Sequence, residues 1–588
     1  MRDRQRVRLG LIFVASLPLF TYPMSWLPGS WAHFRYDVVL PLPEIILAVA
    51  LFLACATLLR KTTGESHAVD FALCPSRWGC LPLLAVLIDG VASTRFSEHS
   101  YFGLELLPRL GGNAAIFLLA ANAPRDSMGP MRKLWMAVAV IVAANGLARL
   151  GSETEFVSTL GNRNFLGTYL AASVVIGTSL GGTWPLVGNF VLLTAMWLCE
   201  SRGAWLALAA VAILWFLECG DRFLQRWMAR AIIVLLLLIS AGSLAQPYVL
   251  RQWRTEVRPM IWKATLHLIA ARPVFGHGLG TYIAVYPKYR PPQYFLSPKA
   301  TNVTDHPHNE LLEVAAEQGL VGVAATLWLW ATAVWCGIRA IRQSTGTERR
   351  GVLGLLGAML VLMFHGMVDV DLRHLPNQSL LWLLMGLLVG AGVASERRAG
   401  IKIHSQPARW CAAAMCLALG IWVATTAVAQ PLVADWRDRE ARIAEAKGDF
   451  GAAAQRAAAA LRLQPFRLTT RYLLAGALSR LPDAQARELA IDQCLQIEQF
   501  APDYADVTYN LGRLYLATNR TVESLPWLRR AVEIDPYDEE RRVALATALH
   551  RLGRNDEAVQ ELNQALQMQP GRQDAGELRQ KIQPERAP

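Results

Sequence analysis

Apolar stretches of about twenty residues recur along the first three quarters of the chain, and this pattern stops near residue 435. Each stretch is long enough to cross a bilayer as a helix. Pro82 and Pro108 interrupt the third and fourth stretches, which makes these two the weakest candidates. The pattern predicts an all-α fold whose main part is a polytopic membrane helix bundle of about 12–13 spans. The predicted spans lie near residues 9–27, 38–59, 78–94, 104–122, 133–150, 164–181, 183–199, 203–219, 229–247, 310–338, 351–370, 378–395 and 409–430.

Beyond residue 435 a different period appears, because Pro502, Pro536 and Pro570 are spaced 34 residues apart. Leu511 and Leu545 keep the same period, as do Ala531 and Ala565, and a 34-residue period is typical of tetratricopeptide repeats. We therefore predict a polytopic membrane domain over 1–434 and an α-solenoid of this repeat type over 435–588. The solenoid would bind a protein partner, or it would only pack on the membrane domain. Its deletion is expected to spare the chemistry and change the choice of acceptor or the assembly.

Composition and charge support this division. Hydrophobic residues make up 53% of the 588 residues and charged residues only 18%, which excludes an ordinary soluble protein. The net charge of +12 belongs to the membrane part, because residues 435–588 hold 22 Lys and Arg against 23 Asp and Glu. This distribution argues against nucleic-acid binding and fits positive-inside anchoring. With a cytoplasmic N-terminus, the long loop at about 248–309 and the repeats are expected on the outer side.

The long loop carries a strong positive charge that the charge rule for short loops does not explain. Only Glu256 and Asp305 oppose the basic residues. An anionic ligand such as a phosphate would account for the excess, and lipid headgroups are the alternative. The basic residues are Arg251, Arg254, Arg258, Lys263, Arg272, Lys288, Arg290 and Lys299.

The same loop contains one predicted helix and one predicted turn. Pro259 after Arg258 fits the first turn of a helix, and Arg272-Pro273 would end it. We expect this helix to lie in the membrane interface. The glycines between Gly276 and Gly280 follow no predicted strand, so they indicate a mobile turn and not a dinucleotide site.

Three groups of polar residues border apolar spans, where polar side chains are costly to keep. Arg202 would extend to the interface or bind a ligand. His306 and His308 could be structural, could ligate a metal, or could accept a proton near neutral pH. His365 and Asp369 are four residues apart, which predicts a structural ion pair on one helical face or a functional pair.

A helix N-cap signal follows His308 directly in the sequence. Asn309 is expected to cap a helix that starts at Glu310, with Glu313 in its first turn. The sequence Glu317-Gln318-Gly319 then follows within the same predicted helix.

Taken together over about 150–390, these motifs resemble the O-antigen ligase superfamily, which includes O-antigen polymerases and some protein O-oligosaccharyltransferases. Their order and their multi-span context carry the resemblance. The motifs are Gly161-Asn162-Arg163-Asn164-Phe165-Leu166-Gly167, Ser201-Arg202-Gly203-Ala204, Arg258 through Trp262, Pro273-Val274-Phe275-Gly276-His277-Gly278, His306-Pro307-His308-Asn309-Glu310 and Glu317-Gln318-Gly319.

The resemblance implies a glycosyltransferase that moves a glycan from a polyprenyl-diphosphate carrier to an acceptor hydroxyl, on the outer face of the bacterial inner membrane. It implies that Arg202 and Arg258 bind the diphosphate, with Arg272 as a further candidate. It also implies that His308, or His306 beside it, activates the acceptor, without metal or other cofactor. The supporting residues would be Asn164, Asn309, Glu317, His365 and Asp369.

Several functions remain open at this point. The enzyme could be a ligase that acts on lipid A core, a polymerase that joins repeat units, or a protein O-glycosyltransferase whose solenoid holds the substrate protein. The alternative from another class is a non-catalytic membrane scaffold or a transporter, with repeats that recruit partners.

Overall fold

The computed structural model of the chain describes residues 2–20, 39–59, 69–74, 77–150, 156–218, 256–393, 399–403 and 405–583. These residues form two compact units, which we describe separately. The membrane unit contains the described residues before 219, Pro273–Leu279 and His308–Leu432. The repeat unit contains helix α12 (Arg258–Ala271), Gly280–Pro307 and the chain from Val433 onward.

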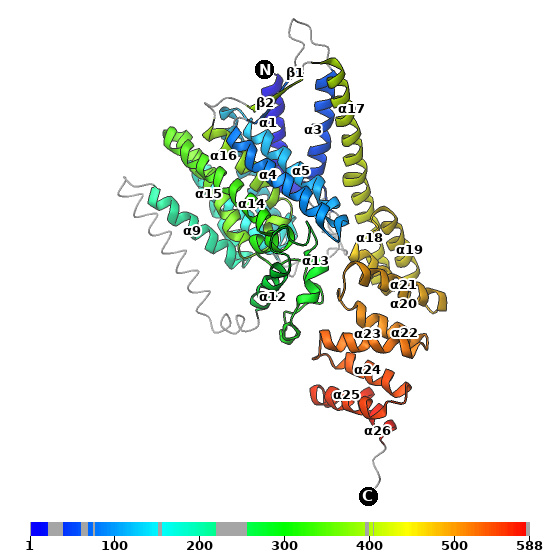
Figure 1. Cartoon of the computed structure of the whole chain (residues 1–588). Helices are drawn as coiled ribbons and strands as arrows, with labels where there is room; N and C mark the ends of the chain where they lie inside the picture. Colours follow the sequence, from blue (N-terminus) through cyan, green and yellow to red (C-terminus); the bar gives the residue numbers. More distant parts are fainter. Residues whose placement is uncertain are drawn as a thin grey trace. The chain divides into compact units, whose positions relative to one another are not determined.

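The membrane unit is built from helices that run side by side as a bundle (Figure 1). Neighbouring helices in space come from distant parts of the chain, as when α15 packs on α7 and α16 packs on α5. The helices are α1 (Arg2–Ala15), α2 (Leu17–Phe20), α3 (Leu42–Leu59), α4 (Arg77–Phe96), α5 (Ser100–Ala121), α6 (Met128–Leu147), α7 (Arg163–Leu180), α8 (Thr183–Leu198), α9 (Arg202–Glu218), α14 (Glu310–Gln343), α15 (Gly346–Gly366), α16 (Asn377–Gly392) and α17 (Gln406–Trp422).

Seven helices in the described part of the chain are long and apolar enough to cross a membrane. Shorter apolar helices cover Thr183–Leu198, Arg202–Leu214 and Asn377–Gly392. The chain is therefore a membrane protein, and the predicted window near 229–247 lies outside the described residues. The seven helices are Leu42–Leu59, Gly79–Phe96, Ser100–Ala121, Arg125–Leu147, Glu310–Gln343, Gly346–Gly366 and Gln406–Ala446.

The weakest predicted spans both form, with Pro82 inside α4 and Pro108 inside α5. Of the predicted span near 9–27, residues 9–20 are described and residues 21–27 lie outside the described part, and the described helix is interrupted at Ser16, between α1 and α2. The Ser16 hydroxyl donates to the carbonyl of Phe13 at 2.8 Å, a local bond that competes with the regular helix pattern.

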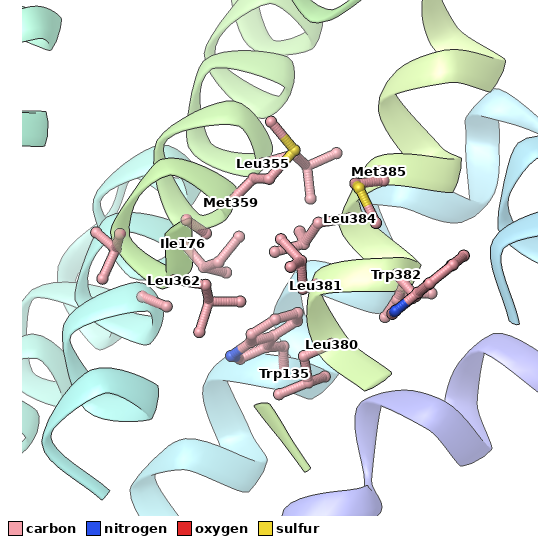
Figure 2. Close-up of a cluster of buried hydrophobic side chains, with 14 of the residues drawn as sticks. Trp135, Ile176, Leu355, Met359, Leu362, Leu380, Leu381, Trp382, Leu384 and Met385 are labelled. Carbon is pink, nitrogen blue, oxygen red and sulfur yellow. The ribbon is translucent and has the colours of Figure 1, made fainter. Parts of the chain in front are cut away.

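The core of the membrane unit lies between α6, α7, α15 and α16. Figure 2 shows Trp135 of α6 and Ile176 of α7 facing apolar side chains of α15 and α16. The Trp135 indole is fully buried, and its Nε1 donates to Ser173 Oγ at 2.9 Å, so its one polar atom is satisfied. Small residues allow close approach elsewhere, since a Cβ at Gly386 would lie 2.3 Å from the Phe117 carbonyl oxygen.

The only strands within the described residues are β1 (Val69–Cys74) and β2 (Ala399–Ile403), which pair antiparallel with Val69 opposite Ile403. The register shifts between Ala72 and Cys74. This short ribbon apart, the predicted all-α fold class is confirmed.

The repeat unit contains the predicted solenoid. Successive helices pack against each other in pairs (Figure 1), and buried Leu511, Ala531 and Leu545 occupy the periodic positions. The Ser524 hydroxyl donates to the Gly512 carbonyl at 2.8 Å and ties one repeat pair together. A π-helical turn, Val423–Ala429, precedes these helices. They are α18 (Gln430–Ala446), α19 (Phe450–Leu463), α20 (Leu468–Ser479), α21 (Ala484–Phe500), α22 (Val507–Ala517), α23 (Thr521–Ile534), α24 (Glu539–Arg551), α25 (Asn555–Met568) and α26 (Gln573–Ile582).

The remainder of the repeat unit comes from the long loop. Helix α12 begins at Arg258 and ends at Ala271, as Pro259 and Arg272-Pro273 predicted. Ile261, Ala264 and Leu268 form its buried face. The short helix α13 (Tyr282–Val285) follows, with the Tyr282 hydroxyl 2.7 Å from Thr265 Oγ1.

Candidate active site

His308 forms a polar cluster with Asp369 and Asn164 in the membrane unit. His308 Nδ1 lies 3.2 Å from Asp369 Oδ1, and Asn164 Nδ2 donates to Asp369 Oδ2 at 2.6 Å. The backbone N–H of Val370 also donates to Asp369 Oδ1, at 2.8 Å. Asp369 is nearly buried, whereas 32% of the His308 side chain is exposed. Because a carboxylate accepts hydrogen bonds, the neutral imidazole carries its proton on Nδ1 and its lone pair on Nε2.

The backbone of His308 adopts an unusual conformation. Its φ is +54°, in the left-handed region that a non-glycine residue seldom occupies. Such a conformation costs free energy and persists where the surrounding contacts fix it, as at many functional sites. The contact with Asp369 therefore holds the ring of an accessible histidine whose backbone is already restricted.

Asn309, the residue after His308, links two elements of the site. Its side-chain oxygen accepts from the Leu312 N–H at 3.0 Å, so Asn309 caps α14 as predicted. Its Nδ2 donates to the Met367 carbonyl at 2.7 Å. One side chain thus joins the start of α14 to the turn that carries Asp369.

His365 lies in the last turn of α15, and the backbone N–H of Asp369, just beyond the helix, donates to the His365 carbonyl at 3.0 Å. The His365 side chain pairs with the Asp371 carboxylate, and both side chains are buried. The expected side-chain pair of His365 and Asp369 stays a prediction. The His365 Nε2 atom lies 3.5 Å from the Ser201 hydroxyl. Burial raises the pKa of the Asp371 carboxyl, and His365 opposes that rise.

This buried pair also lies against the start of α9. A Cβ at Gly203 would lie 2.7 Å from His365 Nε2, which explains the glycine after Arg202. Arg202 is the first residue of α9 and is partly exposed. The Ser201–His365 contact therefore fixes the helix end from which Arg202 extends.

Arg373 is a residue whose partners the sequence analysis missed. Its guanidinium contacts Glu310 at 3.2 Å, Glu313 at 3.5 Å and Glu317 at 3.1 Å. The three carboxylates recur at helical spacing on one face of an otherwise apolar helix. Acidic residues in such a helix need a cation, so this spacing was a signal that could have identified the cluster. Glu317, proposed as a supporting residue, acts here as a structural partner of Arg373.

The glycine-rich segment Pro273–Leu279 is held in place by α14, which corrects the expected mobile turn. The N–H groups of His277 and Gly278 donate to the carbonyls of Ala316 and Glu317, at 3.0 and 2.7 Å. In return, the Leu320 N–H donates to the Pro273 carbonyl at 2.8 Å. Gly319, with φ +69°, interrupts the regular helix at this point and frees these backbone groups.

Gly319 and Gly276 both lie where a side chain cannot fit. A Cβ at Gly319 would lie 2.2 Å from the Val274 carbonyl oxygen, and a Cβ at Gly276 would lie 2.3 Å from the Glu317 carbonyl carbon. The obstructing atoms are backbone in both cases, so no rotamer change relieves the clash. The Pro-x-x-Gly and Glu-x-Gly motifs are therefore two halves of one interlocking contact.

We expect Gly319→Ala to lower the free energy of unfolding by at least about 3 kcal/mol, through steric overlap added to the left-handed φ. The measurement is thermal unfolding of the detergent-purified protein. Gly346→Ala is the matched control, because Gly346 has φ +56° and open space around it. The control substitution should lower the free energy of unfolding by only about 1 kcal/mol. Equal costs for the two variants would show that the interlock adds nothing.

The other predicted site residues belong to the repeat unit. Arg258 begins α12 with its Nε 3.9 Å from Glu256 Oε1, and Arg272 follows the last residue of α12. His306 lies near the end of the Gly280–Pro307 segment. The structure thus brings His308, Asp369 and Asn164 together, whereas the grouping of Arg258, Arg272 and His306 with Arg202 stays a prediction.

Across the residues that the structure describes, no group of three or more His, Cys, Asp or Glu side chains is arranged to hold a metal ion. The cysteines described also form no disulfide among themselves.

Models of known protein families match stretches in both parts of the chain. Residues 187–327 match the family model described as O-antigen ligase, and residues 484–539 and 521–582 match models of the tetratricopeptide repeat. The ligase match includes Arg202, Arg258 and His308, whereas Asn164 and Asp369 lie outside it. No protein with a curated description matches the chain.

Solved structures of MamA are also similar to a quarter of the chain. "MamA RS-1 ArsTM double mutant" shares 16% identity, with 25% of this chain and 82% of that chain covered and a TM-score of 0.24. "MamA MSR-1 C2" shares 23% identity at the same coverage, with a TM-score of 0.23. Such likenesses say nothing about function.

Proposed function

We propose that this membrane protein, which carries an O-antigen ligase domain followed by tetratricopeptide repeats, transfers a glycan from a polyprenyl-diphosphate carrier to an acceptor hydroxyl. The hydrogen-bonded set His308–Asp369–Asn164 is the observation that carries the proposal. It supplies an accessible imidazole with a free lone pair beside a carboxylate that orients it. The match of residues 187–327 to the O-antigen ligase family supports the same class of reaction.

His308 acts as the general base in this proposal. The acceptor oxygen attacks the anomeric carbon of the glycan, and the bond from that carbon to the diphosphate oxygen breaks. The proton of the acceptor hydroxyl passes to His308 Nε2, and the polyprenyl diphosphate leaves with the bonding electrons. Asp369 stabilises the imidazolium that forms, and Asn164 holds Asp369 in the matching orientation.

Arginines bind the leaving diphosphate in this proposal. Arg202 and Arg258, with Arg272 as a further candidate, would donate hydrogen bonds to the phosphate oxygens as negative charge develops. Guanidinium groups can supply this stabilisation without a metal ion, so metal independence is part of the proposal. The reaction would take place on the periplasmic face of the inner membrane, because the positive-inside pattern predicts that the long loop lies on that side.

The experiment uses purified protein in lipid vesicles with a polyprenyl-diphosphate-linked glycan as donor. Three acceptors are offered separately: lipid A core, a second lipid-linked repeat unit and a hydroxyl-rich substrate protein. We expect release of polyprenyl diphosphate together with one glycosylated product, identified by mass spectrometry, and the same yield in excess EDTA. The acceptor that reacts distinguishes ligase, polymerase and protein glycosyltransferase. Absence of release with every acceptor would contradict the proposal and favour a scaffold or a transporter.

A further inference from the structure

Within the repeat unit, the Gly280–Pro307 segment lies directly on the solenoid. Asn302 Nδ2 donates a short hydrogen bond to Asp506 Oδ2, at the start of α22. The guanidinium of Arg541, on α24, lies 5.9 Å from the Phe295 ring. The repeats thus hold a segment of their own chain at Asp506 and Arg541.

Beneath this segment, the buried Arg541 pairs with the partly exposed Asp506. Arg541 Nη2 contacts Asp506 Oδ1 at 2.7 Å, and the Arg541 side chain is 3% exposed. The same guanidinium lies over Tyr509, 5.9 Å from its ring. Because Arg541 is buried and also contacts the Ala531 carbonyl at 3.2 Å and Asp538 Oδ2 at 3.2 Å, its guanidinium is fixed against Asp506.

The bound segment has a fixed structure of its own. Arg290 is buried, donates to the Asn302 carbonyl at 2.9 Å, and lies 4.6 Å from the Phe295 ring. Burial lowers the pKa of the Arg290 guanidinium, and the Asp506 carboxylate is among the charges that oppose this shift. Asp506 therefore binds Asn302, whose carbonyl in turn accepts from Arg290 within the segment.

A series of contacts continues from this surface to the candidate diphosphate-binding arginine. Lys299, three residues before Asn302, contacts Glu256 Oε2 at 3.1 Å, and Glu256 lies beside Arg258. Helix α12 is also tied to the far end of the segment, because Trp262 Nε1 donates to the Pro307 carbonyl at 2.8 Å. Pro307 directly precedes His308 in the sequence.

We propose that Asp506 and Arg541 are positioning residues for glycan transfer, because they hold the segment that fixes α12 and Arg258. This inference rests on the proposed function and assigns the repeats a role inside the reaction. It replaces the expectation that deletion of 435–588 spares the chemistry. A protein partner of the repeats would bind another face, or it would displace the segment and change the rate of transfer.

The test uses the full-length protein in lipid vesicles and the exposed residue Asn302, whose change leaves the solenoid intact. Asn302→Asp places a second carboxylate against Asp506, and we expect about tenfold faster amide hydrogen exchange in residues 286–305 and about tenfold slower glycan transfer. Gln293→Ala, at an exposed position of the same segment, is the matched control and should change neither value.

The conservative variant Asn302→Gln keeps an amide that can donate to Asp506 and leaves the Asp506–Arg541 pair in place, so it should retain slow exchange and most of the transfer rate. A loss caused only by changing position 302 would appear in Asn302→Gln as well. Unchanged exchange in Asn302→Asp would overturn the docking. Faster exchange with an unchanged transfer rate would overturn the positioning role and leave the proposed function standing. The exchange data need no activity, so they separate this inference from a failure of the catalytic assignment.

Discussion

Replacing His308 with asparagine should lower the rate of glycan transfer by about 10²–10⁴-fold and leave the protein folded, because the variant loses its general base. Asparagine is the informative replacement, since it tolerates the left-handed backbone found at His308 better than alanine does. The measurement is the release of polyprenyl diphosphate under single-turnover conditions. Thermal unfolding of the same sample confirms that the fold is retained.

His306→Asn is the matched control for this experiment. His306 is two residues away and was the alternative candidate for the base. We expect this variant to keep most of the activity. Full activity in His308→Asn together with a loss in His306→Asn would move the role of the base to His306. Full activity in both variants would remove the histidines from the mechanism.

The second large effect concerns stability. Arg373→Met should lower the free energy of unfolding by about 3–5 kcal/mol, because three carboxylates lose their shared cation. Glu313 and Glu317 are 3% and 2% exposed, so water cannot replace the guanidinium. In thermal unfolding of the detergent-purified protein this corresponds to a midpoint lower by about 10 °C.

Arg163→Met is the control for the loss of an arginine. Its contact with Glu200, at 3.7 Å, joins side chains that are 47% and 78% exposed, so its loss should cost under about 1 kcal/mol. Adding Glu313→Gln and Glu317→Gln to Arg373→Met should recover much of the stability. Equal midpoints for Arg373→Met and Arg163→Met would contradict the role of the buried cluster.

Local features of the fold could be predicted from the sequence because their causes are local. Pro259 and the Arg272-Pro273 pair fixed the limits of α12, and Asn309 marked the start of α14. The period of 34 residues identified the solenoid in the same way. Each of these signals acts through neighbouring backbone atoms, so no knowledge of the tertiary structure is needed.

The pairings within the candidate site could not be predicted, because they join distant parts of the chain. His308 meets Asp369 across 61 residues of sequence, a pairing that no spacing rule indicates. His365 meets Asp371 beyond the end of α15 at Gly366, where helical spacing gives no guide. Only the tertiary structure shows which carboxylate each imidazole meets.

The interlock of Gly276 with Gly319 also restricts how the chain can evolve. When a side chain overfills a core, a smaller residue at the facing position can often compensate. Here the facing atoms are main-chain atoms, and both positions already hold the smallest residue. A genetic screen that starts from Gly319→Ala should therefore recover true revertants and no suppressor at position 276.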